Sequence, residues 1–444
     1  MNHPRLRSAI VLSLLLTGCA SAPSGQDAAS PLDSVQSAIG APRLPGPGEA
    51  YLDAAWFEQQ LTADLVVQAA LRNNPRVRLE LSRLDAAQAE RIQAGLVSNP
   101  MVSLMALRPE GGGRYELGYS LMQSLFDLFT RSRRIAVAQA AQRRVEAEVI
   151  VQLLSIAQDS QAAYYGALAA QAKLDLQRER LALEEESNRL LQRQASQGAV
   201  SAGAAMEQQA ATSMRAHEMQ AADAELAQAR SALAQLLGLS SASALNLPAS
   251  LPAFAMPGLD APALQALATG NRAELRAATA GIEQAKAERD LQSGALRTYE
   301  PSLGLAGARE SDGMWLNGLE LKVLIPVFDT GQARRDLAST QVVQAELSAE
   351  SVRRQVPLEV ERALSTLATA QLAARHADHH LQQQKLLENL ARRNYEQGNL
   401  DLIAYRQSSQ ARLVSAQDQI DARQALWTAA VDLQRATGVA AISQ

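Results

Sequence analysis

The stretch Trp315-Leu-Asn-Gly-Leu-Glu-Leu-Lys-Val-Leu-Ile325 decides the fold of this chain, because large apolar residues alternate along it with small or charged ones. Trp315, Leu319 and Leu321 fall on one face of an extended segment, and Glu320 falls on the other. This period of two predicts a strand with one apolar face. A half-buried soluble sheet and a membrane barrel with a wet lumen both produce such a pattern, so the alternation alone leaves both open.

Three more short segments show the same alternation, which gives expected strands at 101–107, 115–122, 302–308 and 315–325. Polar, glycine-containing connections join them in pairs, as in hairpins. Their length is close to that of a tilted transmembrane strand. Because no run of 18 apolar residues occurs, any bilayer crossing is expected through strands. Four strands are too few to close a barrel in lipid, so a barrel would have to be shared among subunits.

A long segment with almost no helix-breaking residue follows each strand pair. Between 131 and 196 the only glycine or proline is Gly166, and between 332 and 397 the only one is Pro357. Each segment is therefore expected to form a nearly continuous helix on the order of 100 Å long. Alanine-rich packing faces and few bulky residues favour the wall of a tube, with a solid coiled coil as the alternative.

Each long helix is expected to turn and return at half its length. The turns fall at Gln197-Gly198 and Gln397-Gly398, giving helical hairpins over about 131–237 and 332–437. Shorter helical segments open each half of the chain, at about 62–96 and 261–296. We expect each of them to stack end to end with a return limb, beside the long helix.

The two halves are a duplication at an offset near 200 residues. Matching glycine and proline positions mean that both halves share one order of elements. The pairs are Asn99-Pro100 with Glu300-Pro301, Arg108 with Arg309, Gly118 with Gly318, Phe126-Asp127 with Phe328-Asp329, Gln197-Gly198 with Gln397-Gly398, and Gly238 with Gly438. The expected division is a first repeat at 60–240, a proline-containing linker at 241–259, a second repeat at 260–438 and a tail at 439–444.

The N-terminus predicts export. Arg5 and Arg7 precede an apolar run at 9–16, which has the length of a signal-peptide core. The run ends in Leu16-Thr-Gly-Cys19, which looks like a bacterial lipobox, so residues 1–18 are expected to be removed and Cys19 lipidated. A plain secretory signal with a chance cysteine is the alternative. Residues 19–59 are expected to form the lipidated N-terminal tether, and it is expected to be flexible from Ala20 to about Pro47, where Ser, Ala, Pro and Gly dominate.

Composition excludes several classes of protein. A single cysteine excludes a disulfide scaffold and a multi-cysteine zinc site. A formal charge of -4 without a basic block argues against nucleic acid. No phosphate loop or nucleophile motif appears, so an enzyme, a cofactor or a metal centre is not expected. His376, His379 and His380 form a small cluster that is read as solvated surface histidines rather than as a metal site.

The segment Lys322-Val-Leu-Ile-Pro-Val-Phe-Asp-Thr-Gly-Gln-Ala-Arg-Arg-Asp336 resembles a signature of the TolC-type outer-membrane efflux factors. Tyr395-Glu-Gln-Gly-Asn-Leu-Asp401 is similar to that family as well. The resemblance spans about residues 60 to 438 and is better in the second half. In the first half Phe126-Asp127 lacks the preceding proline, which leaves open where its long helix begins.

This resemblance implies a mainly helical homotrimer whose chains share a 12-stranded transmembrane β-barrel and a 12-helix periplasmic α-barrel. It further implies a lipoprotein in the outer membrane, anchored through Cys19 and extending into the periplasm. The expected function is the passive exit duct of a tripartite efflux pump for drugs or metal ions. The implied partners are outer-membrane lipid, a periplasmic adaptor and a proton-driven inner-membrane pump.

The resemblance also places the periplasmic tip at Gln197, Gly198, Gln397 and Gly398, with Tyr395 and Asp401 as candidate gate residues. Acidic rings of some relatives fall here on Ala404 and Gln407 instead. Asp401 could equally be a carboxylate that stabilises the start of a helix.

Other functions stay open at this stage. They are a duct for type I protein secretion, a lipid-tethered coiled-coil scaffold and a periplasmic adaptor. An adaptor would show one helical hairpin between small β domains, and a scaffold would lack the amphipathic strands.

Overall fold

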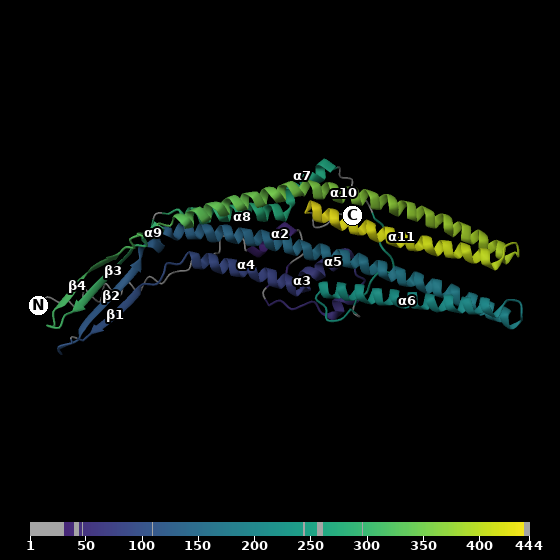
Figure 1. The fold of residues 1–444 in the computed structure, drawn as a ribbon, viewed down its shortest axis with the longest axis horizontal. Helices are drawn as coiled ribbons and strands as arrows, with labels where there is room; N and C mark the ends of the chain where they lie inside the picture. Colours follow the sequence, from purple (N-terminus) through teal and green to yellow (C-terminus); the bar gives the residue numbers. More distant parts are fainter. Residues whose placement is uncertain are drawn as a thin grey trace.

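The computed structural model describes residues 31–39, 44–46, 48–108, 110–242, 245–254, 261–294 and 296–438. The molecule is elongated, with a four-stranded sheet at one end and the turns of two helical hairpins at the other (Figure 1). The expected signal peptide, the lipidation site Cys19 and the tail 439–444 lie outside the described residues.

Each half of the chain contains two short helices, a strand pair and a long helical hairpin, in that order. In the first half these elements are α3 (Ala63–Asn73), α4 (Pro75–Ala94), β1 (Met101–Leu107), β2 (Glu116–Ser124), α5 (Leu125–Ser196) and α6 (Ala202–Leu236). In the second half they are α7 (Ala261–Asn271), α8 (Ala273–Gln292), the one-turn α9 (Leu296–Tyr299), β3 (Ser302–Arg309), β4 (Trp315–Lys322), α10 (Gln332–Glu396) and α11 (Leu402–Thr437).

Short helices lie end to end beside each long one, as expected from the lengths of the segments. Helices α4 and α6 follow one another along α5, and α8 and α11 follow one another along α10 (Figure 1). In the first half, side-chain amides join the α3–α4 connection to the end of α6. Asn73 Nδ2 donates to the carbonyl of Leu237 at 2.8 Å, and Asn74 Nδ2 donates to that of Leu236 at 2.8 Å. These side chains satisfy carbonyls that the end of α6 leaves without a helical partner.

The equivalent junction in the second half is made by charge. Arg272 is 7% exposed and forms ion pairs with Glu274 and Glu359, beside Gly438 at the end of α11. Burial by itself lowers the pKa of Arg272, but the bonds to the two carboxylates outweigh this and raise the pKa overall. Two copies of one junction therefore use different chemistry.

Four elements have boundaries that differ from the sequence expectation. Strand β2 covers 116–124 instead of 115–122 and leads directly into α5, which begins at 125 instead of 131. The direct entry works because Ser124 accepts a hydrogen bond from the Asp127 backbone N–H, as a helix cap does. Strand β3 extends one residue further than expected, to 309. Strand β4 ends at Lys322 rather than at 325, because its partner strand begins only at Ser302, after Pro301.

The expectation of a flexible tether from Ala20 to about Pro47 is wrong for residues 31–39, and the rest of the expected N-terminal segment to residue 59 also contains regular structure. Residues Pro31–Ile39 form a helix, α2, that packs against α5, and Ala54–Glu58 form a 3-10 turn. Val35, Ile39 and Phe57 are each at most 2% exposed. The spacing of Val35 and Ile39 by four residues puts both on one helix face, where they can be buried together.

The main core lies where the middle of α5 meets the ends of α3, α6 and α11. Tyr165 stacks on Trp427 with ring centroids 4.3 Å apart, and Phe254 of the linker packs edge-on against the same indole. Trp427 Nε1 donates to the carbonyl of Pro252 at 3.2 Å, so the linker between the repeats is tied to the core. Among the described residues, none of the helices has the length and apolar composition that a membrane crossing requires.

Candidate functional site: the amphipathic sheet and the helical tips

The sheet has the order β1-β2-β3-β4, with antiparallel pairing throughout. One register row crosses all four strands through apolar residues, because Val102 pairs with Leu121, Leu121 with Leu305, and Leu305 with Leu319. Leu319 is 79% exposed. We call this side the apolar face; its other large members are Leu104, Leu117, Tyr119, Leu303, Trp315 and Leu321.

The opposite side of the sheet is mainly small and polar, and its large apolar exceptions are Met101, Met105, Leu107, Met122 and Leu316. A neighbouring row runs from Ser103 through Ser120 and Ala306 to Gly318. These residues line a hollow on this side, together with Glu320 and Lys322. A sheet with an exposed apolar face and a small, polar opposite face matches a transmembrane barrel wall. A soluble sheet would bury its apolar face in a core instead.

Both edges of the sheet are free of strand partners in the described part of the chain, since β1 pairs only with β2 and β4 only with β3. Because the strands alternate in direction, β4 runs antiparallel to β1. The β4 edge of one copy can thus continue into the β1 edge of another with the same antiparallel geometry. Unpaired strand edges are not tolerated in lipid, so a barrel requires this continuation.

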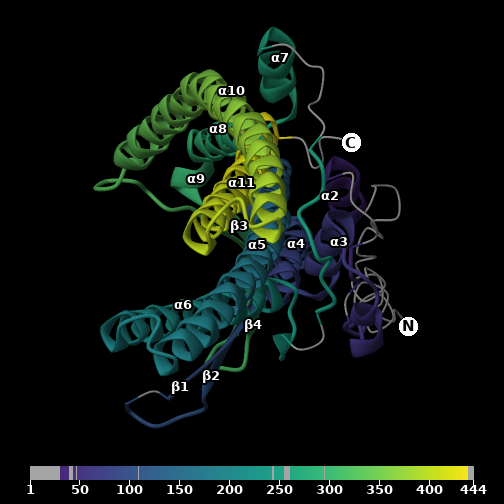
Figure 2. The same cartoon turned by 90° about the vertical axis from the view of Figure 1, so that its right-hand side faces the viewer.

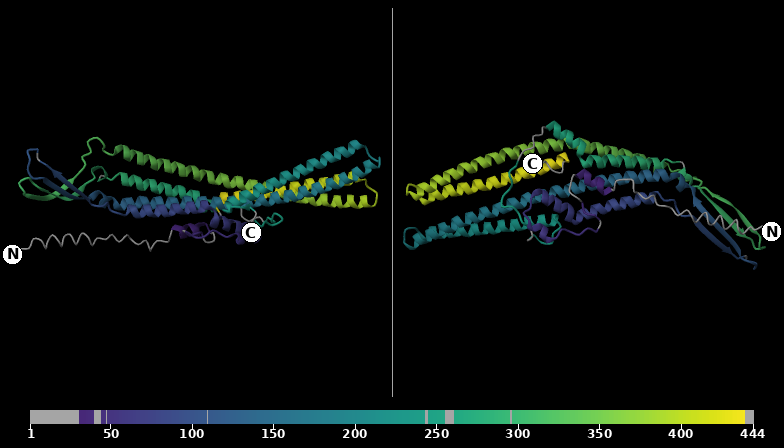
Figure 3. Two further views of the ribbon diagram at one scale, coloured as in Figure 1. Left: turned by 90° about the horizontal axis from the view of Figure 1, so that it is seen from below. Right: turned by 180° about the vertical axis from the view of Figure 1, so that it is seen from behind.

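The turns at the other end of the molecule are nearly identical in the two repeats. Gly198 and Gly398 both have φ 74°, a left-handed value that favours glycine. The N–H of Gly198 donates to Ala195 O at 3.0 Å, and that of Gly398 donates to Tyr395 O at 3.0 Å. Figure 2 shows the two hairpins, α5/α6 and α10/α11, as separate pairs, and the left view of Figure 3 shows them inclined to one another.

Asp401 serves as a helix cap in this structure. Its Oδ1 accepts from the backbone N–H of Ala404 at 2.7 Å. In the first repeat Ser201 takes the equivalent place and accepts from Ala204 at 3.2 Å. The cap accounts for the carboxylate without any further role.

Tyr395 lies on the same turn but does not bond to Asp401. Its ring stacks on Tyr405 with centroids 5.5 Å apart and an interplanar angle of 10°, and the residue is 38% exposed. The structure therefore places the two candidate gate residues close together in the fold and gives them separate contacts.

A buried polar cluster that the sequence did not indicate joins the two hairpins a few turns behind the tips. Glu184 of α5 has a side chain only 7% exposed and pairs with Arg406 of α11 at 2.6 Å. Gln208 of α6 donates to the same carboxylate at 2.7 Å, and Gln410 of α11 donates at 3.2 Å. We call these four residues the hairpin clamp. Glu184 and Arg406 lie 222 positions apart, so no local spacing could have linked them.

Further ion pairs continue along the line where α5 meets α11. Lys173 pairs with Asp421 at 2.9 Å, and Arg435 pairs with Asp159 at 2.6 Å. Arg412 of α11 bonds to Glu179 of α5 and, within the second hairpin, to Glu388. Contact between the first and second hairpins is thus largely polar towards the tips, whereas at the other end of this line the Arg435 pair lies beside an apolar core. Polar groups can replace their protein partners with water more readily than apolar groups can. Separation of the two hairpins at their tips should therefore cost less free energy than separation at the core.

Within the histidine cluster, His380 contacts neighbouring polar side chains. His380 contacts Ser415 Oγ through Nδ1 at 3.1 Å and Gln384 through Nε2 at 3.3 Å, so both of its ring nitrogens are engaged. Within the described ranges, no group of three or more His, Cys, Asp or Glu side chains is placed to hold an ion.

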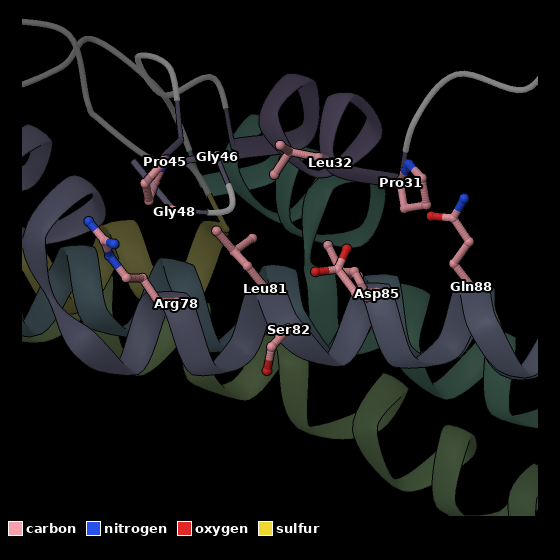
Figure 4. Close-up of a pocket in the computed structure, with 11 residues that line it drawn as sticks. Pro31, Leu32, Pro45, Gly46, Gly48, Arg78, Leu81, Ser82, Asp85 and Gln88 are labelled. Carbon is pink, nitrogen blue, oxygen red and sulfur yellow. The ribbon is translucent and has the colours of Figure 1, made fainter. Parts of the chain in front are cut away.

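A cavity of about 420 Å³ lies between the N-terminal segment and α4 (Figure 4). Pro31, Leu32 and Pro45 line one side, and Arg78 and Asp85 belong to the α4 side. Arg78 is held over the Tyr51 ring at 3.8 Å. Ser82, which also lines this cavity, donates its hydroxyl to the carbonyl of Leu79 at 2.7 Å.

Comparison with solved structures identifies the architecture, although no protein-family model and no curated protein matches the chain. A membrane protein from Pseudomonas aeruginosa is 21% identical, with TM-score 0.70 over 90% of this chain and 99% of the other. The outer-membrane channel OprN is 20% identical, with TM-score 0.68 over 90% and 99%. The outer membrane protein VceC from Vibrio cholerae is 16% identical, with TM-score 0.68 over 87% and 99%. The chain therefore has the fold of these outer-membrane proteins: a mainly helical, duplicated architecture of strand pairs and long helical hairpins.

Proposed function

We propose that three copies of this chain form the passive exit duct of a tripartite efflux pump in a bacterial outer membrane. The observation that carries the proposal is the sheet, which has an exposed apolar face, a small and polar opposite face, and two edges that can pair antiparallel between copies. Three chains would contribute twelve strands to the barrel. The likeness in fold to OprN, which is described as an outer-membrane channel, supports this reading.

In this proposal the helical hairpins form a twelve-helix tunnel that extends from the barrel through the periplasm. Six hairpin turns, at Gly198 and Gly398 of each copy, would surround its inner end. A periplasmic adaptor would engage this end and connect it to a proton-driven inner-membrane pump. Drugs or metal ions would then pass through without any chemistry by the chain itself. Cys19, once lipidated, would add an anchor that holds the N-terminus at the membrane.

The inner end must close when no pump is attached, and the hairpin clamp is the element best placed to close it. It ties the start of α11 to α5 through a buried carboxylate. Release of this tie would let the second hairpin swing away from the first and widen the entrance. Tyr395 and Asp401 lie on the turn that would move with it, so their part in gating is to shape and stiffen that turn.

The test is single-channel conductance of the purified protein in a planar bilayer, combined with its mass in detergent. A trimer with small, discrete conductance is expected, because the barrel would be open and the helical end constricted. A monomer that never conducts would contradict the duct. It would indicate that the sheet does not span the membrane and would favour a lipid-tethered scaffold.

A further inference from the structure

Two arginines meet at the turn end of the sheet, where the two hairpin connections lie. Arg114 comes from the β1–β2 connection and Arg309 ends β3. A Cβ built on Gly313 would lie 3.9 Å from Arg114 Nη1 and 3.9 Å from Arg309 Nη2. The two guanidinium nitrogens are thus at most about 7.8 Å apart, twice that distance. Two like charges this close repel each other unless an anion lies between them.

No carboxylate of the described residues pairs with either arginine. The guanidinium carbon of Arg309 lies over the ring of Trp315, 5.8 Å from its centroid. Asp312, in the same turn, uses its Oδ1 to accept from the Met314 backbone N–H at 2.8 Å. The pair therefore presents unneutralised positive charge.

The pair lies at the margin of the apolar face. Arg309 is in register with Leu117 and with Trp315, so these three form the last row of that face. The next aromatic ring, Tyr119, lies 6.4 Å from Trp315. Aromatic rings beside cationic side chains at the end of an apolar band are typical of the membrane–water interface.

We propose that Arg114 and Arg309 bind the phosphate of a phosphorylated lipid headgroup in the outer leaflet of the membrane. This inference rests on the proposed function, which places the apolar face against lipid and the hairpin connections at the outer surface. A guanidinium binds phosphate through two parallel hydrogen bonds, and one phosphate between two of them cancels their mutual repulsion. Each repeat contributes one arginine, so a trimer carries three such sites.

The test uses native mass spectrometry of the full chain in detergent, with a phosphorylated glycolipid and the same glycolipid after enzymatic removal of its phosphates. The wild type is expected to retain the phosphorylated form and to lose this preference in the Arg114→Gln, Arg309→Gln double variant. Binding should fall by about tenfold or more, because charge-assisted bonds are removed. Arg362→Gln is the matched control, since Arg362 is an exposed arginine on α10, outside the sheet, and it should bind like the wild type.

Two outcomes would overturn the assignment. One is a double variant that binds the phosphorylated glycolipid as tightly as the wild type. The other is complete displacement of that lipid by inorganic phosphate at equal concentration, which would make the pair a site for free phosphate. The conductance and the mass in detergent of the same preparations test the proposed function independently of lipid binding. A wild type that neither assembles nor conducts contradicts the duct, whereas an assembled, conducting double variant with unchanged lipid binding contradicts only the lipid site.

Discussion

Replacement of Arg406 by alanine should loosen the tip of the second hairpin without unfolding the chain. The change leaves the Glu184 carboxylate, whose side chain is 7% exposed, with only the amides of Gln208 and Gln410 as partners. Breaking a buried ion pair costs about 3–5 kcal/mol. We take the lower end, about 3 kcal/mol, because the Arg406 side chain keeps 18% of its exposure. This corresponds to a shift of more than about a hundredfold in the balance between joined and separated hairpins.

The assay is the fraction of time that single channels spend in a high-conductance state, measured beside a thermal melt of the same sample. Arg406→Ala should raise this fraction strongly. Arg435→Ala is the matched control, because its pair with Asp159 also joins α11 to α5 but is nearly half exposed. Such a pair contributes about 1 kcal/mol or less, so its loss should leave the conductance unchanged.

A double variant tests whether closure of the entrance requires the ion pair itself or only the absence of an unpaired buried charge. Glu184→Leu combined with Arg406→Met removes both charges and keeps the site filled, a replacement that is often neutral or stabilising for buried pairs. It should restore the low conductance. If the single Arg406→Ala variant is folded and trimeric yet conducts like the wild type, the clamp does not hold the entrance closed.

Three further outcomes are expected. Asp401→Ala should lower the stability of the start of α11 by about 1 kcal/mol, because the cap is lost, while Asp401→Asn should keep it in a thermal melt. Gly238→Ala should destabilise strongly, since φ is 67° and a Cβ there would overlap the Asn73 carbonyl; Gly166→Ala, which meets no atom within 4 Å, should not. Burial raises the pKa of Tyr164 to about 12. Below pH 10 the phenol is protonated whether the chain is folded or not, and between about pH 10 and 12 only the unfolded chain ionises it. Stability should therefore fall as pH rises through that window, and Tyr164→Phe should remove this part of the fall in a pH series of melts.

Much of the fold could be predicted because the sequence contains two copies of the same order of structural elements. Paired breaks such as Gly198 with Gly398 locate the hairpin turns, and strand alternation located β1 to its last residue. Boundaries were missed where a break residue was missing. The start of α5 was placed six residues late because Ser124 caps it without proline or glycine.

Other features depended on contacts that no local pattern carries. Helix α2 could not be predicted, because Val35 and Ile39 are large apolar residues in a segment of mainly small and polar ones. Their burial depends on packing against α5, which is distant in the sequence. The hairpin clamp joins Glu184 to Arg406 across the whole duplication. A carboxylate within a charged run of a long helix looks solvated until the fold places another helix over it.

The two junctions at which the shorter helices follow one another end to end differ in chemistry although their positions correspond. Asn73 closes the first junction with neutral amide bonds, and Arg272 closes the second with paired charges. A ring of six identical half-chains would have had to keep one chemistry at all six junctions. One chain that carries both halves is free of that constraint. A substitution at Asn73 or at Arg272 therefore changes one junction of the chain and leaves the other as it is.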